Sequence, residues 1–259
     1  MSLIVTIFVR EGIIMAGDSR VPAVVKQSGP NQTLPLGATE IDGNYNVFLT
    51  QNNVGISTYG AGEINNVAIG TYIESFINHE ANQKSLGLEQ TADEIIKFFQ
   101  KFKSPQNISF HVSGYVKANE TLEQHVWEVS VAEGRKRKLN EVAPLGISWG
   151  GESDIIERLL QPLYDVDPDG NATEMPNYKI PWAHISFQDA VDFANFAITA
   201  TVNAMKFQPR PKTVGGPIDI LTIKPDGCAW IQRKETLLSQ MNKEGFVPGK
   251  ARKVIDLKK

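Results

Sequence analysis

Two nearly continuous apolar segments close to the start of the chain constrain its fold most. Residues 3–9 read LIVTIFV and residues 13–16 read IIMA, with only Arg10, Glu11 and Gly12 between them. β-Branched and aromatic residues favour strands, and a short polar connection that contains glycine favours a hairpin. Strands without polar alternation are typical of sheets that are covered on both faces. The opening of the chain therefore predicts a hairpin buried inside a layered domain.

The rest of the chain groups its expected strands and helices instead of alternating them. We expect strands at residues 47–50, 54–58, 108–116, 125–131, 218–223 and 228–232. Apolar spacing predicts helices at 63–80 and 152–163, and capping patterns predict helices that begin at Thr91 and Ser186. Residues 21–39, rich in Pro, Gly, Ser and Thr, indicate irregular or edge structure. This order favours an α+β fold with segregated layers.

Length and charge set further limits. A chain of 259 residues without a convincing linker suits one domain over residues 1–243, followed by a basic tail at 244–259. The net charge of -3 argues against nucleic-acid binding, and the basic residues 135–138 favour a solvated turn. The apolar start is interrupted by Arg10 and Glu11 before it reaches membrane-spanning length. We therefore expect neither a nucleic-acid partner nor a membrane partner.

Cysteine and histidine usage bears on cofactors and compartment. The single cysteine, Cys228, excludes an intramolecular disulfide framework and any Cys-rich metal site. The four histidines show no spacing typical of metal ligands. These observations predict a cytoplasmic protein without a metal or another cofactor.

Four segments spread along the chain resemble one family. They are residues 12–20 (GIIMAGDSR), 60–63 (GAGE), 187–194 (FQDAVDFA) and 215–227 (GGPIDILTIKPDG). In this order they resemble the proteasome-type N-terminal nucleophile hydrolases, including bacterial proteasome β-subunit-like proteins. The resemblance covers most of the chain. It implies a four-layer αββα sandwich, in which two stacked, mainly antiparallel sheets are flanked by helices.

The resemblance also implies a catalytic site. The family nucleophile is the first residue of the mature chain, and its α-amine, with an ordinary pKa of about 7.7–8.0, is the general base. Counting back from Asp18 places this nucleophile at Ser2, after removal of Met1. Asp18 would organise the site through its charge, and backbone N–H groups near Gly60 and Gly62 would form an oxyanion hole. The implied substrate is a peptide or another amide, and the implied assembly is a ring-like homo-oligomer.

Other positions depart from the family pattern. The family lysine on the third strand falls at Leu34 or Gly37, depending on the direction of counting, and Lys26 comes too early. The family acid and serine before the glycine pair fall at Pro211 and Val214. Much of the polar network around the amine is thus missing from its expected positions.

Each candidate residue also has an ordinary structural explanation. Ser2 could be an ordinary terminal serine, and Asp18 could be an acid at a strand end that pairs with Arg20. Gly60 and Gly62 could simply form a tight turn into a helix. The sequence therefore leaves two functions open. One is hydrolysis of peptide or amide bonds by Ser2, and the other is a catalytically inactive structural or binding subunit.

Overall fold

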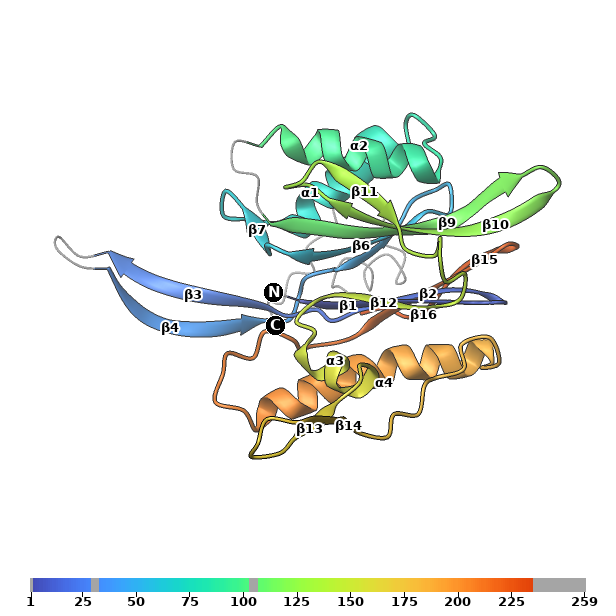
Figure 1. Ribbon diagram of the computed structural model, residues 1–259. Helices are drawn as coiled ribbons and strands as arrows, with labels where there is room; N and C mark the ends of the chain where they lie inside the picture. The colour runs from blue at the N-terminus through green and yellow to red at the C-terminus, as the bar shows by residue number, and fades with distance from the viewer. Residues whose placement is uncertain (1, 29–32, 103–106, 235–259) are drawn as a thin grey trace, which may run out of the picture.

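The chain folds into four layers, helices on sheet on sheet on helices (Figure 1). The computed structural model describes residues 2–28, 33–102 and 107–234, apart from the side chains of residues 22–40. The tail predicted at 244–259 lies outside the described residues. Two five-stranded antiparallel sheets form the inner layers, so the predicted αββα sandwich is confirmed.

The first sheet contains the predicted opening hairpin. Its strand order is β12 (Gly146–Gly151), β1 (Leu3–Val9), β2 (Gly12–Gly17), β15 (Asp219–Lys224) and β16 (Gly227–Gln232). Every residue of β1 and β2 is buried, as the absence of polar alternation predicts. Segments about 200 residues apart in the sequence thus share one sheet, because β2 pairs directly with β15.

The second sheet is built from the middle of the chain. Its order is β11 (Arg135–Lys138), β10 (Thr121–Ser130), β9 (Ile108–Ala118), β6 (Gly55–Gly60) and β5 (Val47–Leu49). The prediction of a solvated turn at residues 135–138 is wrong, because these residues form the edge strand β11. Its side chains alternate between exposed and half-buried, which is how an edge strand accommodates a run of cations.

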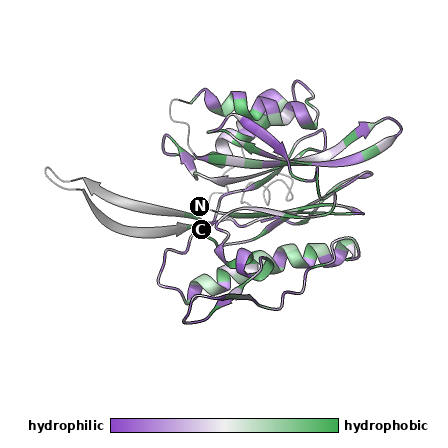
Figure 2. Cartoon of the chain, in the orientation of Figure 1, coloured by the Kyte–Doolittle hydropathy of each residue, from purple (hydrophilic) through white to green (hydrophobic). Residues whose placement is uncertain are grey.

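Two helices cover the outer face of the second sheet. α1 (Ile69–Phe76) continues through the π-helical turn η1 (Ile77–Ala81), and short strands β7 (Glu63–Ile64) and β8 (Val67–Ala68) precede it. α2 (Leu88–Gln100) follows. Along the helices, hydrophilic and hydrophobic residues alternate (Figure 2), as amphipathic helices with one face on a sheet require.

The predicted start of α2 at Thr91 is wrong by one turn. The helix begins at Leu88, whose buried side chain packs in the core beneath the helices. The Thr91 hydroxyl donates to the Gly87 carbonyl over 2.8 Å, and the Gly87 N–H donates to Gln90 Oε1 over 3.1 Å. Gln90 therefore supplies the capping contact that we expected from the Thr91 pattern.

Two further helices cover the first sheet. They are α3 (Asp154–Leu160) and the longer α4 (Phe187–Lys206), which packs small side chains such as Ala190 and Ala194 against β1 and β2. The predicted cap at Ser186 is confirmed, because its hydroxyl accepts a hydrogen bond from the Asp189 N–H. Within the described ranges, no helix is both long and apolar enough to cross a bilayer.

Two hairpins lie outside the four layers. β3 (Val21–Ser28) pairs with β4 (Thr33–Ile41) in a two-stranded sheet that projects from the sandwich (Figure 1). The expectation of irregular or edge structure at 21–39 therefore missed a regular hairpin. A second hairpin joins β13 (Tyr164–Val166) to β14 (Ala172–Glu174).

We expect Ser186→Ala to destabilise the protein by about 1 kcal/mol, because α4 would lose its N-cap acceptor. Urea unfolding followed by circular dichroism measures the change. The matched control is Ser153→Ala at the N-cap of α3, where the side chain accepts no capping hydrogen bond. Equal losses in the two variants would contradict the capping role of Ser186.

Candidate functional site

Ser2 lies just before β1 and is 6% exposed. Its carbonyl accepts a hydrogen bond from the Glu152 N–H over 3.0 Å. The neighbouring residue Gly151 has φ +96°, and a Cβ at this position would overlap the Ser2 carbonyl. Only glycine combines this backbone conformation with such a close approach. The backbone of Ser2 is therefore fixed by the end of β12.

Asp18 binds the peptide N–H of Leu3, the residue that follows Ser2. Its Oδ1 accepts from the Leu3 N–H over 2.9 Å, and its Oδ2 accepts from the Gly215 N–H over 2.8 Å and from the Arg20 N–H over 3.2 Å. The carboxyl is buried, and burial raises the pKa of Asp18 to about 7 although the N–H donors lower it. The structure thus brings the predicted Asp18 to the predicted Ser2.

Arg20 makes its prominent side-chain contacts with a different acid. Its Nε donates to Asp42 Oδ1 over 2.7 Å and its Nη2 to Asp42 Oδ2 over 2.8 Å. The bidentate pair holds the pKa of Asp42 below its ordinary value. The explanation of Asp18 as the ion-pair partner of Arg20 therefore does not account for the three backbone donors around Asp18.

A buried lysine that we did not predict lies next to the Asp18 segment. Lys234 Nζ contacts Asp219 Oδ2 at 3.0 Å, Ser19 Oγ at 2.7 Å and the Asn44 carbonyl. Burial lowers the pKa of Lys234, and the negative charges of Asp219 and Asp18 oppose this effect. The family pattern places its lysine on the segment after Arg20, whereas Lys234 follows β16, so counting along the sequence could not find it. The positions considered from the sequence belong to β3 (Lys26) and β4 (Leu34 and Gly37). The structure does not describe the side chains of these residues.

A second polar network next to Ser2 was also missed. Glu152 accepts from Arg210 Nη1 over 3.1 Å and from Thr213 Oγ1 over 2.9 Å. Arg210 also donates to Asp154 over 2.9 Å. Pro211 cannot supply these contacts, but its neighbours in the sequence do. Pro211 and Val214 thus lack the expected acid and serine, but their neighbours Arg210 and Thr213 hold the Glu152 carboxylate near the same end of β1.

Gly60 is explained by backbone geometry. It has φ +100°, and a Cβ there would overlap the carbonyl of Asn107, which accepts from the Ala61 N–H over 2.9 Å. Gly62 passes close to Val21 and accepts at its carbonyl from the Ile69 N–H over 2.9 Å. Since Ala61 is engaged, Gly60 and Gly62 keep the oxyanion role only as a prediction.

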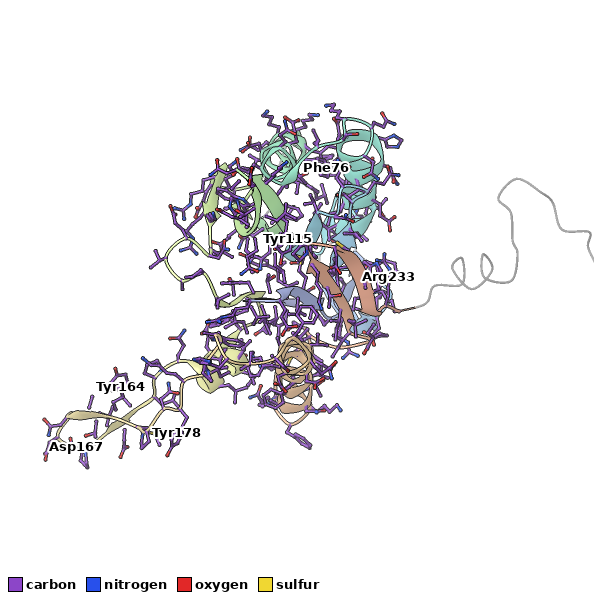
Figure 3. All side chains as sticks on the ribbon, turned by 90° about the vertical axis from the view of Figure 1, so that its right-hand side faces the viewer. Phe76, Tyr115, Tyr164, Asp167, Tyr178 and Arg233 are labelled. Carbon is purple, nitrogen blue, oxygen red and sulfur yellow. The ribbon has the colours of Figure 1, made fainter. Side chains whose placement is uncertain are left out.

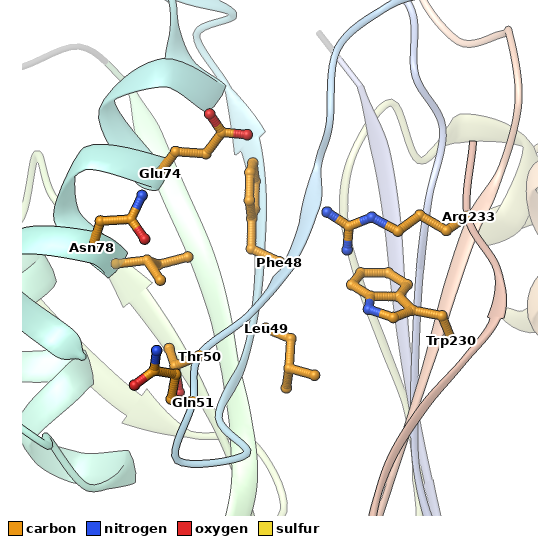
Figure 4. Close-up of a pocket in the computed structure, with 9 residues that line it drawn as sticks. Phe48, Leu49, Thr50, Gln51, Glu74, Asn78, Trp230 and Arg233 are labelled. Carbon is orange, nitrogen blue, oxygen red and sulfur yellow. The ribbon is translucent and has the colours of Figure 1, made fainter. Parts of the chain in front are cut away.

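A cavity of about 390 Å³ lies between β5 and β16, which are edge strands of the two sheets (Figure 4). Phe48, Glu74 and Asn78 lie on one wall, and Trp230 and Arg233 face them from β16 and the residues after it. The Arg233 guanidinium stacks 3.9 Å from the Trp230 ring centre. Neither Ser2 nor Asp18 lines this cavity, so it is distinct from the site around Ser2.

Comparisons with known proteins support the fold. No family model and no curated protein match the chain. The chain is similar to the solved structure of a Gly-1 mutant of Anbu from Hyphomicrobium sp. strain MC1, with a TM-score of 0.57 and 12% identity. The likeness covers 95% of this chain and 94% of that chain. It therefore extends over the whole four-layer sandwich, and at this identity it shows the fold alone.

We expect Asp18→Asn to change how stability depends on pH. Because the pKa of Asp18 is raised from 3.8 to about 7, the folded protein binds one more proton than the unfolded chain between these values. The free energy of unfolding of the wild type should therefore fall with rising pH, by up to about 1.4 kcal/mol per pH unit relative to the variant. Urea unfolding of both proteins from pH 4 to pH 8 measures this difference, and parallel pH curves would contradict it.

We expect Lys234→Met to destabilise the protein by about 3–5 kcal/mol, because Asp219 would keep a buried charge without its cation. Denaturant unfolding checks the loss. Lys84→Met, which breaks the exposed pair with Glu80, serves as the control and should leave stability almost unchanged, because solvent screens that pair. Similar losses in both variants would show that the Lys234 pair is not buried in solution.

Proposed function

We propose that the chain is an N-terminal nucleophile hydrolase that cleaves peptide or amide bonds. After removal of Met1, the Ser2 hydroxyl attacks the substrate carbonyl and the Ser2 α-amine takes the hydroxyl proton. The leaving amine departs with a proton, and water then hydrolyses the acyl-enzyme ester to release the acid and the free hydroxyl. The observation that carries this proposal is the buried, backbone-fixed Ser2 one peptide group away from the buried Asp18 carboxyl.

The charges around Asp18 bear on how the amine acts. A general base must be neutral, and a nearby carboxylate favours the protonated amine. The buried Lys234 ammonium offsets that carboxylate, since the two groups interact electrostatically. Lys234 therefore takes the role that a lysine on the third strand would have, although it follows β16. Asp18 acts as a positioning residue, because its Oδ1 holds the N–H that follows Ser2.

The oxyanion role belongs to the backbone between Gly60 and Gly62. The N–H of Ala61 already donates to Asn107, so we assign the donor to the glycine on either side of it. The ring of Tyr59 lies against Gly150, which brings this end of β6 next to β12 and the Ser2 end of the first sheet. One oxyanion donor stabilises the transition state by about 2.7–4 kcal/mol.

The second candidate is a catalytically inactive structural or binding subunit with the same fold. The positions counted for the family lysine favour this candidate, because they hold Leu34 and Gly37, and neither residue carries an amine. The proposed setting is the same for both candidates: a cytoplasmic, closed homo-oligomer, in which a hydrolytic site would be enclosed. The two candidates differ in whether the Ser2 amine is free and reactive.

The protein produced without tags should lack Met1 when its intact mass is measured. It should also react with a fluorophosphonate probe, with a rate that rises as the pH increases through the ordinary pKa of an α-amine. Ser2→Ala should abolish this labelling, because the attacking oxygen is lost. Ser186→Ala, which removes an exposed serine, should retain it. Retained Met1, or labelling that survives in Ser2→Ala, would exclude the proposed nucleophile and favour the inactive subunit.

A further inference from the structure

The β13–β14 hairpin forms an arm that stands away from the body of the protein. Figure 3 shows Tyr164, Asp167 and Tyr178 on this projecting segment. Every residue of β13 and β14 is exposed. Tyr164 is 56% exposed, Val166 60% and Tyr178 94%. The arm thus presents large apolar side chains to solvent, which is unusual for a segment that has no binding role.

An isolated two-stranded hairpin is marginally stable in water, so this arm needs either internal bracing or a partner. Its turn is braced by Asp167, which accepts from the Asp169 N–H over 3.0 Å and from the Asn171 N–H over 2.8 Å. This bracing orders the tip and leaves the apolar residues of the strands uncovered. A partner surface that covers them would remove apolar area from water and stabilise the arm.

The charge of the arm points to a basic partner surface. Its acids are Asp165, Asp167, Asp169 and Glu174, and the described residues form no ion pair with any of them. Strand β11 of the same chain carries four cations in a row, Arg135, Lys136, Arg137 and Lys138. A second copy of this chain therefore offers a surface of complementary charge.

The cations of β11 can accept additional carboxylates. Lys136 pairs with Asp93 at 2.7 Å, Arg137 with Glu128 at 2.7 Å, and Arg135 with Glu133. The side chains of Arg135 and Arg137 are 68% and 64% exposed, so these pairs contribute little and each guanidinium keeps donors in solvent. Within the described residues, β11 is also a sheet edge without a neighbouring strand on its outer side.

The arm and β11 lie on the same side of the molecule. Both face the viewer in Figure 1 and lie on the left-hand side in Figure 3. Between them in the sequence, Val142 is 96% exposed. Trp149, also between them, and Trp182, which follows the arm, line a groove of about 470 Å³. Two complementary patches on one face are what a two-fold symmetric interface requires, because each patch meets the other across the axis.

We propose that two copies of this chain associate through this face, with the acidic arm of each copy packed against β11 and Val142 of the other. The proposal does not depend on Ser2, because none of the residues that carry it lies at the proposed hydrolytic site. The interface is apolar at the arm strands and charged at the turn and β11. Association should therefore weaken as salt concentration rises without being abolished by it.

A charge-reversal pair tests the proposal by sedimentation velocity. The first variant is Asp165→Arg with Asp169→Arg on the arm, and the second is Arg135→Glu with Lys138→Glu on β11. Each variant alone should show a dissociation constant at least about tenfold higher than that of the wild type, a change of about 1.4 kcal/mol. An equimolar mixture should form a heterodimer, because both of its arm-to-strand contacts then join opposite charges.

The control is Glu120→Arg at the exposed β9–β10 turn, which should associate as the wild type does. Circular dichroism melting curves identify any variant that has lost its fold. A wild type that stays monomeric at the highest attainable concentration would overturn the proposal. So would self-association that is unchanged in both charge-reversed variants, or a mixture that fails to restore it. These outcomes are independent of the labelling of Ser2, so the proposed hydrolysis and the proposed interface can fail separately.

Discussion

One buried carboxyl group ties together the segments on which the rest of the structure depends. Asp18 accepts from the N–H groups of Leu3, Arg20 and Gly215, which belong to the first strand, the segment after the second strand and the segment before β15. A buried carboxyl without partners would cost several kcal/mol, so the three donors specify one arrangement of these segments. The same arrangement fixes the position of the chain immediately after Ser2.

The buried charges beside Asp18 are also balanced by partners. Lys234 is buried, and its Nζ lies between Asp219, Ser19 and a backbone carbonyl. Burial favours the neutral forms of Lys234 and Asp18, and the negative charges of Asp219 and Asp18 favour the charged form of Lys234. The site is therefore an electrostatically coupled unit rather than a set of independent side chains. Its acid–base behaviour belongs to the unit and changes when any member is removed.

Local sequence patterns predicted most of the strands and helices. The features that they did not predict depend on contacts between residues far apart in the sequence. The apolar residues of β1 and β2 and the cap at Ser186 are local signals, and the structure confirms them. Thr91 carries a capping pattern too, but the burial of Leu88 extends the helix by one turn. For the candidate site, counting back from Asp18 in the sequence singled out Ser2, and in the structure the N–H that follows Ser2 donates to Asp18. Lys234 and Glu152 could not be found, because only the folded sheet brings residues so distant in sequence to the same place.

The pairing of β2 with β15 has a consequence for the timing of biosynthesis. Gly215 and Lys234 emerge from the ribosome long after Leu3 and Asp18, so a growing polypeptide lacks two of the groups that complete the cluster. Contacts between such distant segments form late and slowly. The cluster around Asp18 can thus be completed only after Lys234 has been synthesised. A nascent chain that ends before Gly215 would therefore hold Asp18 without one of its three backbone donors and without the lysine beside it.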